Sequence, residues 1–247
     1  MTAVLVRHGE TAWNREGRVQ GWAPTSLTDR GREQARTLGA HLASAYDVDR
    51  AVASDLRRAR ETAVLLHETG VDPAPTYSQR WRERDFGIYQ GLTEAGLFET
   101  HPEFRATGGT MATRARPPGG ERLLDLRERV LMCWTALLAD ATPGETVLVV
   151  THGGPIYVLL AHLKGMDLPA SFVEHSHDNC ALTVAFGAPE RGLPAVLGVD
   201  PGSVREDGHD ETGRFDLWLD TVPNQGSEVV RTEEAVFATL ACLNLME

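Results

Sequence analysis

The sequence predicts an α/β protein of three layers, in which helices cover both faces of a mostly parallel central sheet. Two apolar runs with the composition of buried strands, Val4–Val6 and Val147–Val150, each lead into a histidine followed by glycine. A third short apolar run occupies residues 50–54, and segments with helical spacing separate the runs. Strands that alternate with helices are typical of parallel sheets, whose carboxyl ends meet at one edge and collect ligands there.

Composition narrows the class of protein. The chain has 247 residues, 42% hydrophobic and 24% charged, as expected of one large soluble domain or two small ones. Its formal net charge of −11 argues against nucleic acid and anionic membranes as partners. The three cysteines, Cys133, Cys180 and Cys242, are scattered and are expected to be free thiols. No leader and no apolar run of ~18 residues is present, so the expected location is the cytoplasm.

The first half of the chain predicts a strand, a loop and two helix-strand units. Residues 10–25 read as a polar loop whose aromatic, amide and arginine side chains suggest a ligand wall. Thr28 or Asp29 caps a helix that continues to about residue 43. The strand 50–54 opens into a helix at 55–67, and one arginine of its first turn is expected to point across the strand ends.

The second half begins with a proline-marked turn and an extended piece at 76–81. The remaining expected elements are short helices at 92–107, a glycine-rich and proline-rich loop at 108–120, an amphipathic helix at 121–140, the strand 147–150, a helix at 155–163, and a hairpin of edge strands at 180–186 and 195–199.

We expect one catalytic domain over residues 1–200, with 88–120 as a candidate lid or cap insertion. Residues 201–247 form an extension of the same domain, with a weak strand pattern at 214–219 and a terminal helix at 228–245. This extension is expected to cover the site, to form a homodimer contact through its apolar face, or to be an appendage.

The two strand ends are the first indication of a site. His8 and His152 each follow a buried strand, and a hydrophobic strand has no structural use for Arg7-His8 at its tip. Because the carboxyl ends of parallel strands meet at one edge, the two imidazoles are expected to converge there.

At this point the chain resembles the histidine phosphatase superfamily, also called phosphoglycerate-mutase-like, and in particular its phosphatase branch. The resemblance covers about residues 3–186. It rests on these ordered blocks: Leu5-Val6-Arg7-His8-Gly9-Glu10-Thr11 with Trp13-Asn14, Gly17-Arg18-Val19-Gln20-Gly21, Leu27-Thr28-Asp29-Arg30-Gly31, Ser54-Asp55-Leu56-Arg57-Arg58-Ala59, Arg82-Glu83-Arg84-Asp85-Phe86-Gly87 with Gln90-Gly91-Leu92, Pro118-Gly119-Gly120-Glu121, and Val150-Thr151-His152-Gly153.

The resemblance implies a role for each matching residue. His8 is the nucleophile that accepts the phosphoryl group, and Glu83 is the proton donor to the leaving oxygen. Arg58 is preferred over Arg57 because it directly precedes the alanine of the motif, Ala59. The residues implied to bind phosphate or substrate are Arg7, Asn14, Gln20, Gly21, Arg58, Glu83, His152 and Gly153.

The chemistry of a phosphate monoester asks for the same kinds of residue. Its barrier is very high, so catalysis depends on positioning and on stabilising charge on the equatorial oxygens. Guanidinium groups form paired hydrogen bonds with such oxygens. Nearby arginines also oppose protonation of His8, which must be neutral to attack. Arginine and imidazolium supply the positive charge, so we expect neither a metal nor another cofactor.

The predicted function is hydrolysis of a small phosphorylated metabolite through a phosphohistidine on His8, with Glu83 as general acid and base. The alternative is bisphosphate-dependent mutase chemistry, in which the phosphoryl group returns to the substrate. Such mutases typically carry Asn-Lys after the Gln-Gly-Leu block, where this chain has Thr93-Glu94. A catalytically idle binder of phosphorylated ligands would be indicated by the loss of a site residue, and none is lost. A zinc hydrolase would need a spacing of metal ligands that the sequence lacks.

The substrate is less sharply indicated. Five aromatic residues fall near the predicted mouth of the site and favour a substrate with a ring or an apolar portion, unless they belong to the core: Trp13, Trp22, Trp81, Phe86 and Tyr89. The cluster His175-Ser176-His177-Asp178 is interpreted as a loop at the rim of the phosphate site and not as a metal site.

Overall fold

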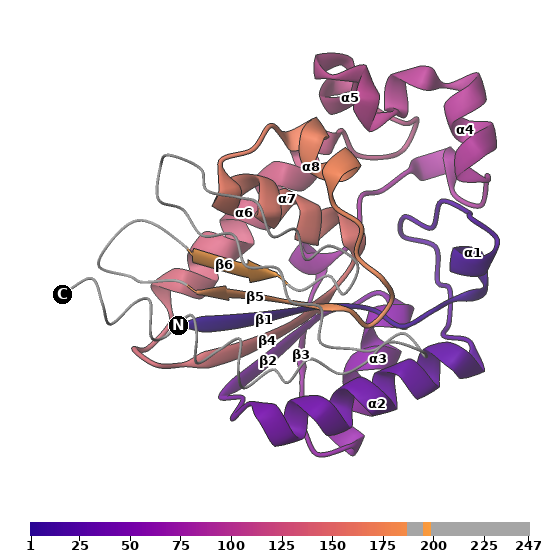
Figure 1. The fold of residues 1–247 in the computed structure, drawn as a ribbon. Coiled ribbons are helices and arrows are strands. Elements are labelled where there is room, and N and C mark those ends of the chain that lie inside the picture. The colour runs from indigo at the N-terminus through magenta and orange to yellow at the C-terminus, as the bar shows by residue number, and fades with distance from the viewer. Residues whose placement is uncertain (187–194, 199–247) are drawn as a thin grey trace, which may run out of the picture.

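The structure, a computed structural model, describes residues 1–186 and 195–198. Within these residues the sheet has the strand order β3-β2-β4-β1-β5-β6 (Figure 1). The strands are β1 (Thr2–Arg7), β2 (Arg50–Ser54), β3 (Thr76–Ser78), β4 (Thr146–Thr151), β5 (Leu182–Phe186) and β6 (Ala195–Gly198). Strands β1 to β4 are joined in parallel pairs, whereas β5 runs antiparallel to β1 and β6 antiparallel to β5. The predicted mostly parallel sheet with an edge hairpin is confirmed.

Helices cover both faces of this sheet. The described α-helices are α1 (Ala12–Arg15), α2 (Asp29–Ala45), α3 (Arg57–Glu68), α4 (Glu94–Thr100), α5 (Thr110–Arg114), α6 (Leu123–Ala139), α7 (Gly153–Lys164) and α8 (Leu168–Glu174). Figure 1 shows α2 and α3 on one face and α6, α7 and α8 on the other. The predicted three-layer α/β/α architecture is therefore confirmed.

The sheet contributes side chains to two separate hydrophobic cores, one on each face, because successive side chains of a strand point to opposite faces. Val4 and Val6 of β1 pack with residues of α2 and α3, whereas Ala3 and Leu5 join the cluster built by α6 and α7. All four are fully buried. Burial on both faces explains why these strands read as continuous apolar runs in the sequence.

The helix starts follow local chemistry. Thr28, one of the two caps that the sequence predicted, caps α2, because its hydroxyl accepts the Gly31 N–H at 3.0 Å. The helix expected from residue 55 begins instead at Arg57, since the Asp55 carboxylate is bound by Arg82 at 2.6 Å and Leu56 remains extended. In α7, Pro155 lies in the first turn, where its missing N–H leaves no hydrogen bond unmade.

Three short helices depart from the prediction. The loop expected at 10–25 contains α1, which a reciprocal pair of hydrogen bonds between Thr11 and Asn14 caps. The loop expected at 108–120 contains α5, and α8 falls in a segment for which no element was predicted. Figure 1 places α4 and α5 on the same side of the molecule as α1, beyond the carboxyl ends of the strands. The lid role of residues 88–120 stays a prediction.

Some predictions lie beyond the described residues. They are the strand at 214–219, the helix at 228–245, the homodimer face of the extension and the thiol of Cys242. Cys133 and Cys180 are free, as predicted. Within the described residues no single helix has the length and apolarity to cross a membrane, and only α7 and α8, bent by 116° to each other, meet that criterion as a pair.

Candidate active site

The candidate site lies where β1 and β4 end side by side. Their parallel register pairs Arg7 with Thr151, so the residues that follow, His8 and His152, leave adjacent strands together. The His8 N–H donates to the Thr151 carbonyl at 3.0 Å, and the imidazole centroids are 5.1 Å apart with the rings tilted by 58°. Both histidines are buried. The convergence that the sequence predicted for these two side chains is present.

The hydrogen bonds of His8 define which ring nitrogen carries its proton. Its Nδ1 lies 2.8 Å from the Gly9 carbonyl oxygen, which can only accept, so Nδ1 is the N–H donor. The lone pair therefore resides on Nε2, to which Arg58 Nε donates at 3.1 Å. Burial first, and then the charges of Arg58 and Arg7, hold the pKa of His8 well below its ordinary value. The ring is a neutral imidazole with Nε2 as its basic atom.

Arg58 is a buried cation at the start of α3. Its guanidinium donates to the carbonyls of Gly21 at 2.8 Å and Ala23 at 3.2 Å, and its side chain is 1% exposed. Burial lowers its pKa to about 10, so it remains charged at neutral pH. Its neighbour Arg57 is exposed and pairs with Glu61 at 2.7 Å. The structure thus brings Arg58, and not Arg57, to His8.

Two of the predicted phosphate-binding residues have a polar atom that is buried without a hydrogen-bond partner among the described residues: Arg7 Nε and His152 Nδ1. Arg7 is held through Nη1, which donates to the His177 carbonyl. His152 is held through Nε2, which lies 2.8 Å from Ser54 Oγ. A buried polar atom left unpaired costs about 1–3 kcal/mol, so atoms of this kind beside His8 mark a place built for an anionic ligand.

The state of His152 follows from its surroundings. Burial first, and then the charges of Arg58 and Arg7, hold its pKa well below the ordinary value, so the ring is neutral. Ser54 Oγ accepts the Leu56 N–H at 3.3 Å and can donate its own proton to Nε2. In that arrangement Nδ1 carries the ring proton and presents it to the site.

Glu83 reaches the same edge from the loop that follows the 3-10 helix Gln79–Trp81. Its carboxylate accepts the N–H of Arg84 at 2.8 Å and that of Gly154 at 3.2 Å. Gly154 belongs to the first turn of α7, which begins directly after His152, so the carboxyl group of Glu83 lies at the N-terminus of that helix. Glu83 is therefore placed beside the imidazoles although it is distant from them in sequence.

The other predicted site residues have structural contacts at the rim. Asn14 Oδ1 accepts the Thr11 N–H at 3.1 Å, and Gln20 Oε1 accepts hydrogen bonds from the hydroxyls of Thr11 at 3.0 Å and Thr25 at 2.7 Å. These bonds use the amide oxygens and leave the amide NH₂ groups as the donors that an anion would need. Gly21 offers its carbonyl to Arg58, and Gly153 opens α7. Their contacts with phosphate stay a prediction.

The structure adds residues that sequence reasoning missed. Ser54 orients His152, the Thr62 hydroxyl accepts the Gly9 N–H at 3.0 Å, and Asn179 Nδ2 donates to the His8 carbonyl at 2.9 Å. Ser54 ends a strand that neighbours β4, which is a signal that could have been used. Asn179 directly follows the cluster His175-Ser176-His177-Asp178, which the sequence placed at the rim of the phosphate site, but its contact with His8 was not predicted.

The aromatic residues divide between core and rim. Trp81 is 1% exposed and belongs to the core of α6 and α7, so for this residue the core alternative holds. Phe86 and Tyr89 pack against a small separate cluster that contains Leu97. Trp22 lies closer to the site, because its indole N–H donates to the Glu83 carbonyl at 2.7 Å.

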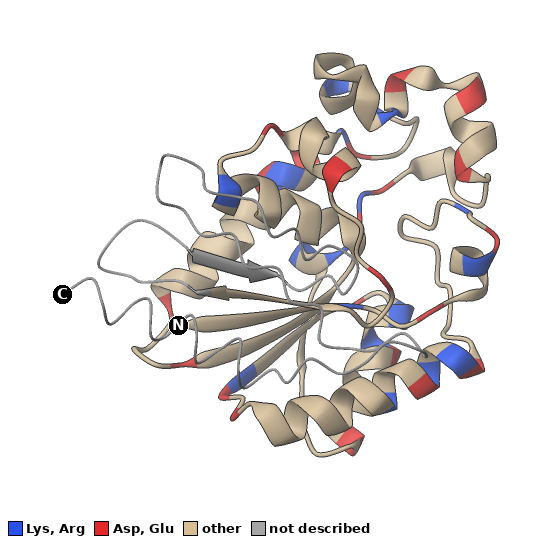
Figure 2. Cartoon of the chain, in the orientation of Figure 1, with Lys and Arg blue, Asp and Glu red and all other residues tan. Residues whose placement is uncertain are grey.

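Arginines lie at this edge although the chain has a net charge of −11. Figure 2 shows Lys and Arg segments beside the carboxyl ends of the strands, with Asp and Glu segments among them. Neutral imidazole, guanidinium groups and a carboxylate are the components that phosphoryl transfer through a histidine requires. Among the described residues no group of three or more His, Cys, Asp or Glu side chains is arranged to hold a metal ion.

Comparisons with known proteins agree with this geometry. The sequence model of the histidine phosphatase superfamily (branch 1) matches residues 3–196. The 2,3-bisphosphoglycerate-dependent phosphoglycerate mutase of Methylobacterium radiotolerans is 38% identical over 174 residues, 66% of this chain and 79% of the relative.

Solved structures of phosphatases are similar as well. A mycobacterial glucosyl-3-phosphoglycerate phosphatase has a TM-score of 0.66 at 30% identity, over 79% of this chain and 96% of that one. A putative α-ribazole-5′-P phosphatase of Escherichia coli has a TM-score of 0.68 at 29% identity, over 79% and 94% of the two chains.

Proposed function

This chain belongs to the histidine phosphatase superfamily, branch 1, and on that premise we propose that it hydrolyses a small phosphate monoester through a phosphohistidine on His8. One observation carries the proposal. The hydrogen bond to Gly9 leaves the lone pair of His8 on Nε2, burial and the arginine charges keep the ring neutral, and the buried Arg58 guanidinium lies 3.1 Å from that atom. A nucleophile that is neutral and a cation that can bind phosphate oxygens are thus held together before the substrate arrives.

In the first step the phosphate oxygens take over the N–H donors of Arg58, Arg7 and His152, and His8 Nε2 attacks the phosphorus. The P–N bond forms as the P–O bond to the alcohol oxygen breaks. Glu83, in its protonated form, gives its proton to the departing oxygen, so the products of this step are the free alcohol, the phosphohistidine and the Glu83 carboxylate.

In the second step a water molecule attacks the phosphorus and the P–N bond breaks. Glu83 takes a proton from that water, which restores its protonated form, while His8 returns to the neutral imidazole and inorganic phosphate leaves. The protein finishes the cycle in its starting state. The guanidinium groups stabilise the charge on the equatorial oxygens in both steps.

The competing function is the mutase reaction, and the similarity to the Methylobacterium radiotolerans mutase favours its consideration. Two observations support hydrolysis instead. The phosphatases above are similar over about four-fifths of this chain. At the position where the resemblance implies a lysine for mutases, this chain has Glu94, whose negative charge would repel a second acid group of a bisphosphate.

The test is phosphate release from an aryl phosphate in the presence of EDTA, for the wild type, His8→Ala and a control variant, His67→Ala. His67 lies at the other end of α3 and pairs with Asp72, outside the site. We expect the wild type and the control to release phosphate and His8→Ala to release none. An acid-labile phosphoenzyme should form with the wild type and the control but not with His8→Ala. Full activity of His8→Ala would contradict the proposal.

The mutase and the idle binder give different results in the same experiment. A mutase forms the phosphoenzyme from a bisphosphoglycerate but releases phosphate slowly, whereas an idle binder forms no phosphoenzyme at all.

A screen that compares triose phosphates with aryl and other bulky phosphates then tests whether Trp22 at the rim favours a substrate with an apolar portion. Preference for triose phosphates would contradict that expectation.

A further inference from the structure

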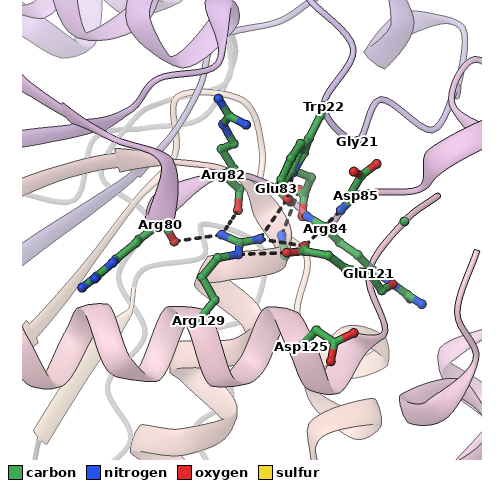
Figure 3. Close-up of polar contacts among 12 residues, drawn as sticks. Gly21, Trp22, Arg80, Arg82, Glu83, Arg84, Asp85, Glu121, Asp125 and Arg129 are labelled. Atoms are coloured by element: carbon green, nitrogen blue, oxygen red, sulfur yellow. Dashed lines mark hydrogen bonds and ion pairs between the residues drawn. The ribbon is translucent and has the colours of Figure 1, made fainter.

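The loop that carries Glu83 is held by one arginine from a different layer of the fold. Arg129 lies on α6, and its guanidinium donates through Nη1 to the carbonyls of Arg80 at 2.8 Å and Arg82 at 2.9 Å. Its Nη2 donates to the carbonyl of Glu83 itself at 3.2 Å (Figure 3). Three backbone carbonyls of a four-residue segment thus converge on one side chain.

A carboxylate fixes that guanidinium in turn. Glu121 accepts Arg129 Nε at 3.0 Å through Oε1 and Nη2 at 2.8 Å through Oε2, which is the two-bond fork that arginine forms with a carboxylate. Both side chains are less than one-fifth exposed. Glu121 also accepts the N–H of Asp85 at 3.2 Å, so the pair binds the loop on both sides of Glu83 in the chain.

Arg84 attaches the same loop to the next segment. It is 5% exposed, and it donates to the carbonyls of Glu121 at 3.0 Å and Ala115 at 2.9 Å. The side chain of Glu83 consequently has little freedom of its own, because its backbone is tied by Arg129 and its carboxylate by the N–H groups of Arg84 and Gly154. A general acid needs this precision, since a displacement of about 1 Å can cost about 100-fold in rate.

We propose that Arg129, oriented by Glu121, is a positioning residue that holds Glu83 at the leaving oxygen of the substrate. This inference rests on the proposed role of Glu83 as general acid. Arg129 makes no hydrogen bond to His8 or His152 among the described residues. Its charge adds to burial in lowering the pKa of His152, and its hydrogen bonds reach the reaction through the Glu83 loop.

The leaving group of the substrate separates this role from a merely structural one. A weakly basic leaving group, such as 2,4-dinitrophenolate, departs without a proton, whereas an alkoxide requires one. The quantity to compare is kcat/KM, because it covers only the steps up to departure of the leaving group and excludes hydrolysis of the phosphoenzyme. Glycerol 2-phosphate serves as the alkyl substrate and 2,4-dinitrophenyl phosphate as the aryl substrate.

The variants are Arg129→Met, Arg129→Lys and Glu121→Gln, with Glu83→Gln as reference and Arg127→Met as control. Arg127 is an exposed arginine of the same helix. We expect Arg129→Met to lower kcat/KM for glycerol 2-phosphate by about 100-fold, within the range that general acid catalysis supplies. The value for 2,4-dinitrophenyl phosphate and competitive inhibition by inorganic phosphate should stay close to wild type, and Arg127→Met should change none of the three.

The reference variant keeps the two proposals distinguishable. If Glu83→Gln leaves both substrates unaffected, the proposed function is wrong in its general acid. If Glu83→Gln selectively loses the alkyl substrate while the Arg129 variants lose both substrates equally, or neither, the positioning role is overturned. Should Arg129→Met fail to fold, Arg129→Lys and Glu121→Gln decide the question, because each removes the fork and keeps part of the contact.

Discussion

Replacing Gly154 by alanine should lower the activity of this protein far more than its stability. Gly154 lies in the first turn of α7 and gives its N–H to the Glu83 carboxylate at 3.2 Å. A Cβ atom at this position would overlap Glu83 Oε1 and lie 3.1 Å from its Cδ and 3.2 Å from Leu126 Cδ2. The clash is with the end of a side chain, so the carboxylate is expected to rotate away and the helix to persist.

The magnitude follows from the bond that is lost. A hydrogen bond to a charged group contributes about 1.5–3 kcal/mol, which corresponds to a factor of about 10 to 150 in rate when that bond positions the acid. Alanine is favoured over glycine within a helix by up to about 1 kcal/mol. We therefore expect kcat/KM for glycerol 2-phosphate to fall by about 10-fold to 150-fold and the melting temperature to fall only slightly, because the helix preference of alanine offsets part of the lost hydrogen bond.

The control is Gly108→Ala, since a Cβ atom there would meet only Ala112 Cβ and the Pro102 carbonyl oxygen, each at 3.8 Å. Activity is measured by phosphate release and stability by thermal unfolding. Wild-type activity of Gly154→Ala on the alkyl substrate would refute the reasoning, because it would mean that the carboxylate does not act from the position it occupies.

Two further predictions concern the buried histidines. Ser54→Ala leaves His152 Nε2 without its 2.8 Å partner, so we expect a loss of about 1–3 kcal/mol of stability and weaker inhibition by inorganic phosphate; unchanged inhibition would contradict the role of Ser54 in orienting His152. Stability should also fall in acid, because burial depresses the pKa of His8 and His152 and lowers that of His177 to about 4, so below about pH 6.5 the unfolded chain binds more protons than the folded one. The free energy of unfolding should fall by up to about 1.4 kcal/mol per pH unit for each histidine, as measured by urea unfolding at several pH values. His177→Gln should reduce this dependence. A free energy of unfolding that does not change with pH would contradict the assignment.

The features that could be predicted from sequence are those with a local cause. His8 and His152 were found because each ends an apolar strand, and parallel strand ends meet whatever the rest of the chain does. The edge hairpin was likewise readable from β5 and β6 themselves.

What sequence reasoning missed depends on distant partners. Helix α1 has four residues, too few to be stable by propensity, and exists because Thr11 and Asn14 cap it within the folded loop. The contact between Arg129 and the Glu83 loop joins positions 46 residues apart, and that between Asn179 and His8 joins positions 171 apart. Whether Trp81 lies at the mouth or in the core stayed open, because nothing in its neighbourhood along the chain shows that α6 covers it.

The place of β1 in the middle of the sheet has a consequence for biosynthesis. Its parallel neighbour β4 begins only at Thr146, and its other neighbour β5 only at Leu182. At translation rates of about 5–20 residues per second, the nascent β1 waits roughly 7–30 s before its first partner is made. During that time a strand that is fully buried in the native protein stays without its sheet, so it is a natural target for chaperones on the ribosome.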